Sequence, residues 1–170
     1  DTSAVGKPDS TALLAQYREL ATKPGLVAMQ ADMAPLAGAA HKISAEFVFP
    51  YLAHAPMEPL NCTIQRDGDK AELWMGTQMP GLDAMAAAKT LGLPPQNIQV
   101  HTQMAGGGFG RRAIPSSDYV VEACGVAKAV RTAGISAPVR TLWSREDDIK
   151  GGYYRPMHVH RAEIGFDAKG

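Results

Sequence analysis

Cysteine is scarce in this sequence, and Cys62 and Cys124 are the only two among 170 residues. Their spacing matches neither a metal-binding pattern nor a disulfide framework. Both lie among apolar neighbours in the chain, and an unpaired cysteine commonly behaves as a small core residue. We therefore predict two buried free thiols.

An excess of charge of either sign is also missing, because 17 Lys and Arg balance 17 Asp and Glu. Such a balance gives no overall field that would favour nucleic acid or acidic lipid. No run reaches the about 18 consecutive apolar residues that a membrane span needs. No Gly-x-Ser-x-Gly pattern marks a nucleophilic serine. We therefore expect no nucleic-acid partner, no membrane span and no serine-hydrolase site in this chain.

The given residues open with Asp-Thr-Ser, without an initiator methionine and without the pattern of a signal peptide. It stops at Asp167-Ala168-Lys169-Gly170, where a hairpin turn begins without a return strand. A length of 170 residues allows one domain, or one domain with an appendage. We therefore expect a piece of a longer polypeptide.

Glycine, in contrast, is concentrated in one stretch, Ala-Gly-Gly-Gly-Phe-Gly-Arg-Arg at residues 105–112. Residues 97–104 before it alternate apolar and polar side chains, which is the period of a half-buried strand. After it, Ser116, Ser117 and Asp118 can cap a helix whose apolar residues recur at helical spacing to about residue 131. The glycines are therefore expected in a loop that connects a strand to a helix.

Glycine in such a loop permits positive φ and close approach of the backbone to a ligand, because it has no Cβ. Successive main-chain N–H groups can then converge on an anion, and the guanidiniums of Arg111 and Arg112 add charge and forked donors. The alternative is a glycine-rich surface turn beside two solvated arginines, since a short motif of this kind is weak on its own.

The other periodic segments predict an α+β fold. Helices are expected from Asp9 or Ser10 to just before Pro24 and over 81–91, with a helical turn at 144–148. Strands are expected at 26–29, 41–48, 61–66, 70–75, 138–143 and 157–166, with a hairpin turn at Asp67-Gly68-Asp69. The order of elements favours a mixed β-sheet with helices packed on one face, in two layers. We divide the chain into an N-terminal helix and linker, residues 1–40, and a main domain, residues 41–170.

Two patterns contain possible metal ligands. His54 and Glu58 have the spacing of helical ligands, but the prolines around them rule out the helix that would bring them to one face. His158 and His160 share one face of a strand, yet no third ligand accompanies them. We therefore favour structural or exposed roles for these side chains over a metal site.

Gln78 stands directly after the 70–75 strand and before the next helix, where open sheets place ligand-binding groups. A glutamine can donate an N–H and accept a hydrogen bond, which suits an oxo ligand or a carbonyl but not acid–base catalysis. The alternative, equally consistent with this position, is an amide that caps the following helix.

Three ordered motifs together resemble a known family. They are His54-Ala-Pro-Met-Glu58-Pro with Asn61-Cys62-Thr63, then Gly76-Thr77-Gln78-Met79-Pro80, and then Gly106-Gly107-Gly108-Phe109-Gly110-Arg111-Arg112. With their spacing they resemble the molybdopterin-binding subunit of the xanthine dehydrogenase/aldehyde oxidase family. The Gly-Phe-Gly-Arg-Arg ending resembles its isoquinoline 1-oxidoreductase β-subunit branch. The resemblance covers about residues 42–166.

The resemblance implies roles for individual residues. A glutamine at the position of Gln78 hydrogen-bonds an oxo ligand of molybdenum, and Phe109 offers its main-chain N–H beside the metal. The surrounding glycines admit the pterin, and the two arginines are expected near the phosphates of a dinucleotide. The predicted cofactor-binding residues are Gln78, Gly107, Gly108, Phe109, Gly110, Arg111 and Arg112.

The resemblance also implies an activity for the parent protein. It would be a molybdenum-dependent oxidoreductase that hydroxylates an N-heterocycle or oxidises an aldehyde, with water as the oxygen donor and a 2Fe-2S subunit as electron acceptor. The expected cofactor is molybdopterin as its cytosine dinucleotide. In the family's xanthine dehydrogenases a substrate-binding glutamate follows the glycine motif, whereas Ala113 stands there here, so purine selectivity is not implied.

The family's catalytic base is a glutamate far downstream, so no catalytic residue is expected within these 170 residues. Residues 41–170 would supply the first half of the cofactor cradle, and the C-terminal half of the same polypeptide would supply the rest. A ligand that bridges two halves loses most of its contacts with one. We therefore expect this chain alone to bind no cofactor stably and to be inactive.

Two hypotheses of other classes compete with this one. The first is a non-catalytic nucleotide- or phosphate-binding module that uses the Gly106–Arg112 loop. Against it, Gly106-x-Gly108-x-Gly110 has a shorter step than Gly-x-Gly-x-x-Gly, and no Gly-Lys-[Ser/Thr] follows. The second is a packing domain whose loops contact only partner chains.

Overall fold

The computed structural model describes residues 9–170, which divide into two compact units. The first unit contains the chain up to Leu52 together with Pro156–Gly170, and the second is Ala53–Arg155. This division differs from the expected one after residue 40, because the strand that starts at His41 pairs with the last strand of the chain and not with the central sheet.

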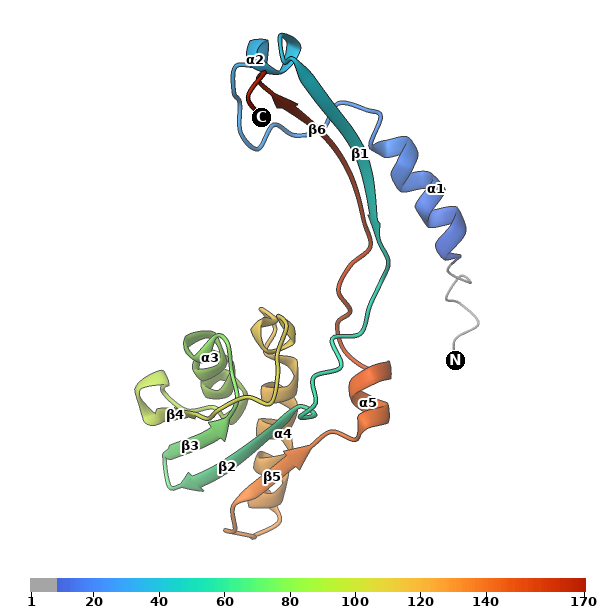
Figure 1. Ribbon diagram of the computed structural model, residues 1–170. Coiled ribbons are helices and arrows are strands. Elements are labelled where there is room, and N and C mark those ends of the chain that lie inside the picture. Colours follow the sequence, from blue (N-terminus) through green and yellow to red (C-terminus); the bar gives the residue numbers. More distant parts are fainter. Residues whose placement is uncertain (1–8) are drawn as a thin grey trace. The chain divides into compact units, whose positions relative to one another are not determined.

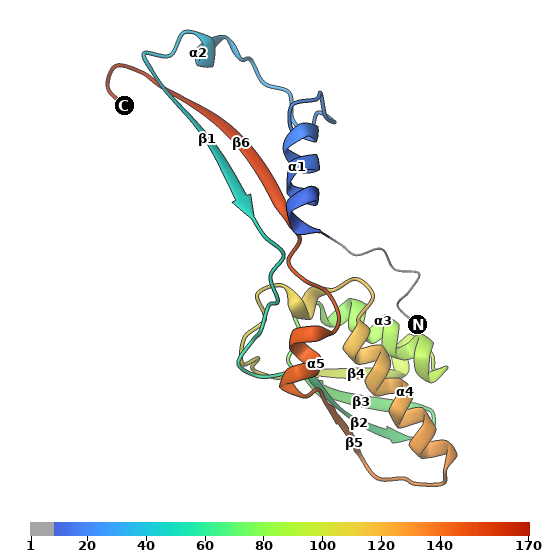
Figure 2. The same cartoon turned by 90° about the vertical axis from the view of Figure 1, so that its right-hand side faces the viewer.

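The second unit is a four-stranded sheet covered by two helices. The strands β2 (Asn61–Asp67), β3 (Lys70–Met75), β4 (Ile98–Thr102) and β5 (Val139–Leu142) lie in the order β4-β3-β2-β5. β3 is parallel to β4, whereas β2 is antiparallel to both its neighbours. Helices α3 (Pro80–Leu91) and α4 (Asp118–Thr132) lie on one face of the sheet (Figures 1 and 2). The predicted α+β fold, with a mixed sheet and helices on one face, is confirmed.

The core of this unit lies between the sheet and the two helices. Alternate strand residues, among them Ile64, Leu73 and Met75, are buried against Leu91 of α3 and Val120 of α4. This alternation is what the period-two pattern of the sequence predicts. Short elements complete the unit: α5 (Arg145–Lys150) and the 3₁₀ turns η1 (Pro95–Asn97) and η2 (Arg111–Ala113).

Both cysteines belong to this core. Cys62 on β2 and Cys124 on α4 are buried free thiols, so that prediction is confirmed. Burial raises the pKa of each thiol to about 12. Because the thiolate is the reactive form, neither residue is suited to nucleophilic or metal-binding chemistry.

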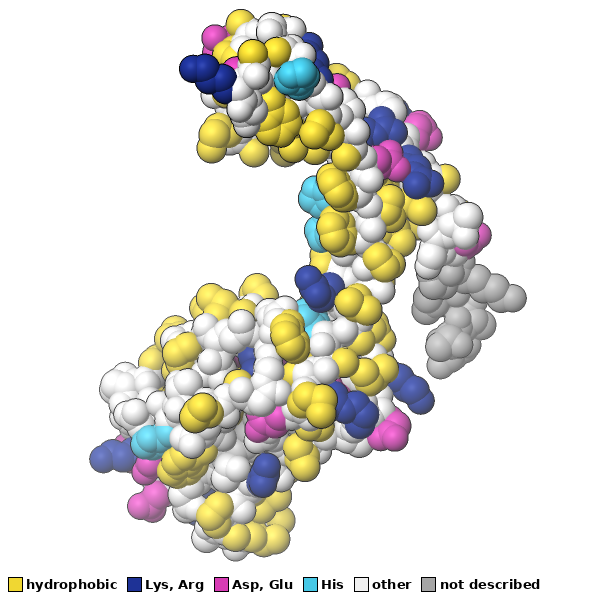
Figure 3. Space-filling model, in the orientation of Figure 1, with side chains coloured by type: hydrophobic (Ala, Val, Ile, Leu, Met, Phe, Trp, Pro, Cys, Tyr) yellow, Lys and Arg dark blue, Asp and Glu magenta, His cyan; other side chains and the backbone are white. Residues whose placement is uncertain are grey.

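The first unit contains α1 (Ser10–Leu20), α2 (Ala34–Ala37) and an antiparallel ribbon of β1 (His41–Phe49) and β6 (His158–Phe166). α1 begins where expected, since the Asp9 carboxylate accepts a hydrogen bond from the N–H of Thr11 at 2.8 Å. The ribbon buries little, and apolar side chains stay on the surface of this unit (Figure 3).

The prediction of a strand at residues 26–29 is wrong. These residues are exposed and form no strand, because no other described segment pairs with their backbone. None of the helices between residues 9 and 170 is long and apolar enough to cross a lipid bilayer.

Candidate functional site

The glycine stretch forms the loop between β4 and α4, as the sequence predicts. Gly107 and Gly110 have φ values of +104° and +99°, which L-residues with a side chain rarely adopt. Phe109 lies between them at φ +55° and is 69% exposed. A bulky residue held in the left-handed region is a mark of local strain, and such strain gathers at ligand-binding sites.

Three successive N–H groups of this loop have no acceptor within residues 9–170. They belong to Gly107, Gly108 and Phe109. The flanking N–H groups are bonded, that of Gly106 to the Glu58 carboxylate at 2.9 Å and that of Gly110 to Gln78 Oε1 at 3.2 Å. The loop is therefore fixed at both ends and keeps a short row of main-chain donors between them.

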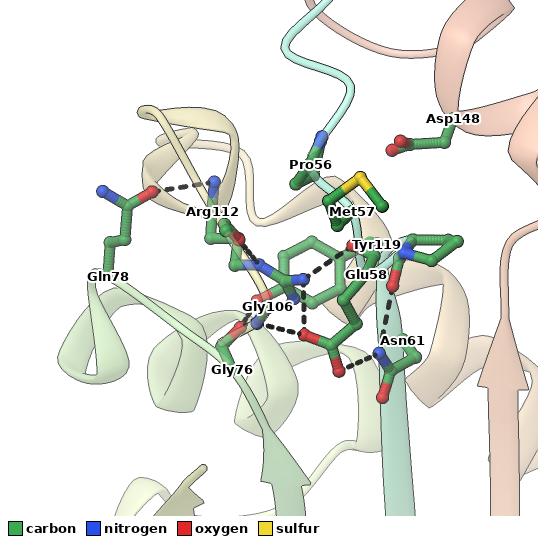
Figure 4. A network of polar contacts seen from close by, with 12 residues as sticks. Pro56, Met57, Glu58, Asn61, Gly76, Gln78, Gly106, Arg112, Tyr119 and Asp148 are labelled. Carbon is green, nitrogen blue, oxygen red and sulfur yellow. Dashed lines mark hydrogen bonds and ion pairs between the residues drawn. The ribbon is translucent and has the colours of Figure 1, made fainter. Parts of the chain in front are cut away.

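Gln78 follows β3 and faces this loop (Figure 4). The side-chain Oε1 of Gln78 accepts hydrogen bonds from the N–H groups of Gly110 and Arg112, each at 3.2 Å. The main-chain N–H of Gln78 donates to the Arg112 carbonyl at 3.2 Å. No described residue accepts from its Nε2. The amide carbonyl is thus used to orient the side chain, and the amide N–H groups remain as donors.

The glycines are also required by packing against neighbouring segments. A Cβ on Gly106 would lie 2.6 Å from Glu58 Cβ, and one on Gly108 would lie 2.7 Å from Gln78 Oε1. Gly108 itself is not among the residues with positive φ. A side chain at position 108 would therefore displace the amide of Gln78 from its bonds to the loop, whereas the left-handed conformation is taken by the neighbouring residues.

The side chains of Arg111 and Arg112 do not lie where a free phosphate site would need them. They are only 2% and 1% exposed. Arg111 forms a two-pronged ion pair with Asp118, at 2.9 and 2.7 Å, with its guanidinium 5.4 Å from the Trp143 ring centroid. The Asp118 carboxylate is therefore engaged with Arg111. The side-chain cap expected at the start of α4 is not formed, since the Ser117 side chain makes no capping hydrogen bond.

Arg112 is bonded on all sides by the chain itself. Its guanidinium donates to the carbonyls of Gly107, Gly76 and Glu58 at 2.8, 3.2 and 3.0 Å and pairs with the Glu58 carboxylate at 2.9 Å (Figure 4). Both guanidiniums are thus engaged with groups of the chain itself. A contribution of either residue to a cofactor site stays a prediction.

Glu58 is named in the sequence patterns only as a possible metal ligand and as part of a motif, and its contact with the glycine loop and Arg112 was not predicted. Burial opposes its ionisation, but hydrogen bonds from Gly106 and Asn61 and the charge of Arg112 outweigh burial and hold the pKa of Glu58 below its ordinary value. The local signal for this structural role is a glutamate enclosed by two prolines, Pro-Met-Glu-Pro, which marks a charged residue in a rigid, non-helical segment.

The possible metal ligands are not brought together. No group of three or more His, Cys, Asp or Glu side chains in residues 9–170 could hold a metal ion. His158 and His160 do lie side by side on β6, with ring centroids 5.4 Å apart, but without a third ligand. His54 lies beside the glycine loop, and burial, followed by the charge of Arg111, lowers the pKa of His54.

Known proteins share this sequence pattern. The model of the molybdopterin cofactor-binding domain family matches residues 21–170. The isoquinoline 1-oxidoreductase subunit beta of Brevundimonas diminuta is 40% identical over 110 residues, which is 64% of this chain and 13% of that protein. The aldehyde oxidoreductase molybdenum-binding subunit PaoC of Escherichia coli K12 is 33% identical over 132 residues, 78% of this chain and 17% of that protein. The chain therefore spans less than a fifth of the length of these relatives.

Solved structures share the fold. Quinoline 2-oxidoreductase from Pseudomonas putida 86 matches 80% of this chain and 17% of its own, with a TM-score of 0.59 and 24% identity. The aldehyde oxidoreductase from Desulfovibrio gigas matches 81% of this chain and 15% of its own, with a TM-score of 0.58 and 20% identity. The resemblance that the motifs predicted is thus confirmed, and the chain belongs to the molybdopterin cofactor-binding domain family found in the aldehyde and isoquinoline oxidoreductases.

Proposed function

We propose that this chain forms part of the molybdopterin site of a larger molybdenum hydroxylase. The observation that carries the proposal is the row of three N–H groups, at Gly107, Gly108 and Phe109, without an acceptor in the described chain. Main-chain N–H groups are strong donors that normally find a partner. A ligand rich in oxygen and nitrogen acceptors fits this row, and the absence of Cβ atoms lets it come close.

Gln78 would supply a further donor beside the same loop. Its carbonyl is held by two main-chain N–H groups, so its Nε2 has a fixed direction. A donor fixed in this way is suited to an oxo or carbonyl oxygen, because little freedom is lost when the bond forms. Arg111 and Arg112 are proposed to support the site by holding the loop, since their guanidiniums are buried in internal contacts.

The cofactor, when bound, would supply the redox chemistry by which an N-heterocycle or an aldehyde is oxidised with water as the oxygen donor. The residues of this chain would bind and orient it. We propose the cytosine dinucleotide form, a 2Fe-2S subunit as partner, and a catalytic base in the remaining C-terminal part of the polypeptide. The names of the relatives support molybdenum and the two classes of substrate. The cytosine form, the iron–sulfur partner and the downstream base rest on the family resemblance of the three sequence motifs. The 170-residue chain alone is proposed to be inactive.

The hypothesis of a non-catalytic phosphate-binding module loses its support, because both guanidiniums of the Gly106–Arg112 loop are paired inside the chain. No observation favours it over the molybdopterin site.

Gln78→Glu in the full-length parent tests the proposal. This variant keeps an oxygen that can accept from the loop, but it removes the donor and adds a negative charge. We expect turnover to fall by roughly 10- to 100-fold, the value of a hydrogen bond to a charged group. Gln99→Glu is the matched control, because Gln99 is exposed on β4 and lies outside the loop.

Molybdenum content and released nucleotide are measured on the same preparations. The wild-type parent should contain molybdenum and release cytidine monophosphate on hydrolysis. A wild-type parent without molybdenum would contradict the proposed function. Unchanged turnover of Gln78→Glu at full metal content would contradict the proposed role of Gln78 but not the proposed function of the chain.

A further inference from the structure

The carboxylate of Glu58 connects the 53–60 segment to the glycine loop. Its Oε2 accepts from the N–H of Gly106 and from Nη2 of Arg112, both at 2.9 Å, and its Oε1 accepts from Nδ2 of Asn61 at 2.9 Å (Figure 4). Three donors from different parts of the unit thus fix one carboxylate. Both oxygens are therefore engaged in holding neighbouring groups of the chain.

The main chain of Glu58 adds to this connection. Its N–H donates to the Gly106 carbonyl at 3.0 Å, and its carbonyl accepts from Nη2 of Arg112 at 3.0 Å. The segment that carries Glu58 is itself held, because Arg145 donates to the carbonyls of Pro56 and Met57 at 2.7 and 2.8 Å. The start of the glycine loop is therefore bound to a rigid support.

The carbonyls of the loop explain why its N–H groups are free. The Gly106 carbonyl accepts from Glu58 N–H at 3.0 Å, the Gly107 carbonyl from Nε of Arg112 at 2.8 Å, and the Gly108 carbonyl from Arg111 N–H at 2.9 Å. In a planar trans peptide the C=O and the following N–H point in opposite directions. Three carbonyls bound inside the unit therefore direct the next three N–H groups, those of residues 107–109, away from these partners.

We propose that Glu58 and Arg112 are positioning residues that turn the N–H groups of Gly107 and Gly108 toward the cofactor. The Glu58 carboxylate fixes the Gly106 N–H and the Arg112 guanidinium, and this keeps the Gly106 carbonyl on the main-chain N–H of Glu58 and the Gly107 carbonyl on Arg112. This inference rests on the proposed function of the loop. Arg112 does not bind phosphate in this arrangement. Arg112 acts through the loop backbone. Its side chain is completely buried, and the carboxylate of Glu58 neutralises its charge there.

Hydrogen exchange of the full-length parent, prepared without cofactor, tests the inference. The amides to follow are those bonded in the loop, at residues 106 and 110–112. In Glu58→Ala we expect them to exchange roughly 10- to 100-fold faster, as the loss of a charge-assisted hydrogen bond predicts. Exchange in β2 and β3 should stay as in the wild type. After the variant is loaded with cofactor, the amount of molybdenum that it retains should fall together with the protection of the loop amides from exchange.

Two variants complete the design. Glu58→Gln keeps an acceptor oxygen without the charge, so it should restore part of the protection and part of the molybdenum retention. It also decides the test should Glu58→Ala fail to fold. Glu72→Ala is the matched control, since Glu72 is an exposed carboxylate on β3 that pairs with His101 at 2.7 Å. It should change neither readout.

The outcomes separate the inference from the function on which it rests. Wild-type exchange at residues 106 and 110–112 in the Glu58 variants would overturn the positioning role. Faster exchange with normal molybdenum retention would overturn the part of the inference that directs the loop to the cofactor. A wild-type parent that contains no molybdenum would instead contradict the proposed function, while the exchange result would still show whether Glu58 holds the loop.

Discussion

The two units of this chain differ in what holds them together. The second unit buries Leu60, Ile64, Leu73 and Val120 almost completely between its sheet and its helices. In the first unit, residues such as Ile43, Phe47 and Phe49 on β1 stay about half exposed, and no residue of α1 is buried. A two-stranded ribbon without a packed face is marginally stable in water. The second unit is thus stabilised by its own buried core, whereas the ribbon of the first unit has no comparable core within the described residues.

The proposed site follows this difference. Gln78, the glycine loop and Glu58 all belong to the second unit. Gln78 stands at the end of a core strand, and the loop is tied to the strand end and to the 53–60 segment by hydrogen bonds. A binding site must be held by a rigid support if its donors are to keep their directions. The core of the second unit therefore contributes to function by fixing the ends of the loop.

The largest expected contrast is between an apolar strand residue of the second unit and one of the first unit. In the 170-residue chain, Leu73→Ala should lower the free energy of unfolding by about 2–5 kcal/mol, because it leaves a cavity in a closed core. Ile43→Ala should change it by less than about 0.5 kcal/mol, as for most surface substitutions. Denaturant unfolding followed by far-ultraviolet circular dichroism is the measurement, because it reports on both units. Tryptophan fluorescence isolates the second unit, since Trp74 and Trp143 both lie there. Equal shifts for the two variants would contradict the contrast.

A smaller contrast is expected between ion pairs. Arg112→Ala should lower the free energy of unfolding by about 2–3 kcal/mol, below the usual range for breaking a buried pair, because Glu58 is 34% exposed. Arg161→Ala breaks a pair with Glu46 on the exposed ribbon and should leave the unfolding midpoint unchanged. The same unfolding experiment measures both. An Arg112→Ala chain as stable as the wild type would show that the buried network does not support the unit.

Much of the second unit could be predicted from the sequence, because its local patterns agree with its final packing. Alternation predicts β2 and β3, Asp67-Gly68-Asp69 predicts their turn, and the glycines lie between strand and helix as expected. The separate pairing of β1 with β6 could not be read in this way. It joins His41 to Phe166, and no local pattern encodes a partner so far along the chain.

The sequence indicates which residues lie at the candidate site better than it indicates which contacts they make. Gln78 and the glycines meet as the motifs imply, but a sequence does not say whether an arginine faces solvent or the interior. Arg112 is buried because Glu58, 54 residues earlier, supplies the opposite charge. A side chain at Gly108 would displace the amide of Gln78, which lies against it although the two residues are 30 positions apart. Such reasons arise only from the folded chain.

The central claim is that the N–H groups of residues 107–109 are presented to a molybdopterin cofactor. Amide hydrogen exchange of the full-length parent, compared with and without cofactor, tests it most directly. The amides at 106 and 110–112 are bonded within the chain and should be protected in both states. Those at 107–109 should exchange rapidly without cofactor and become protected only when it is bound. Equal exchange of residues 107–109 in the two states would contradict the claim.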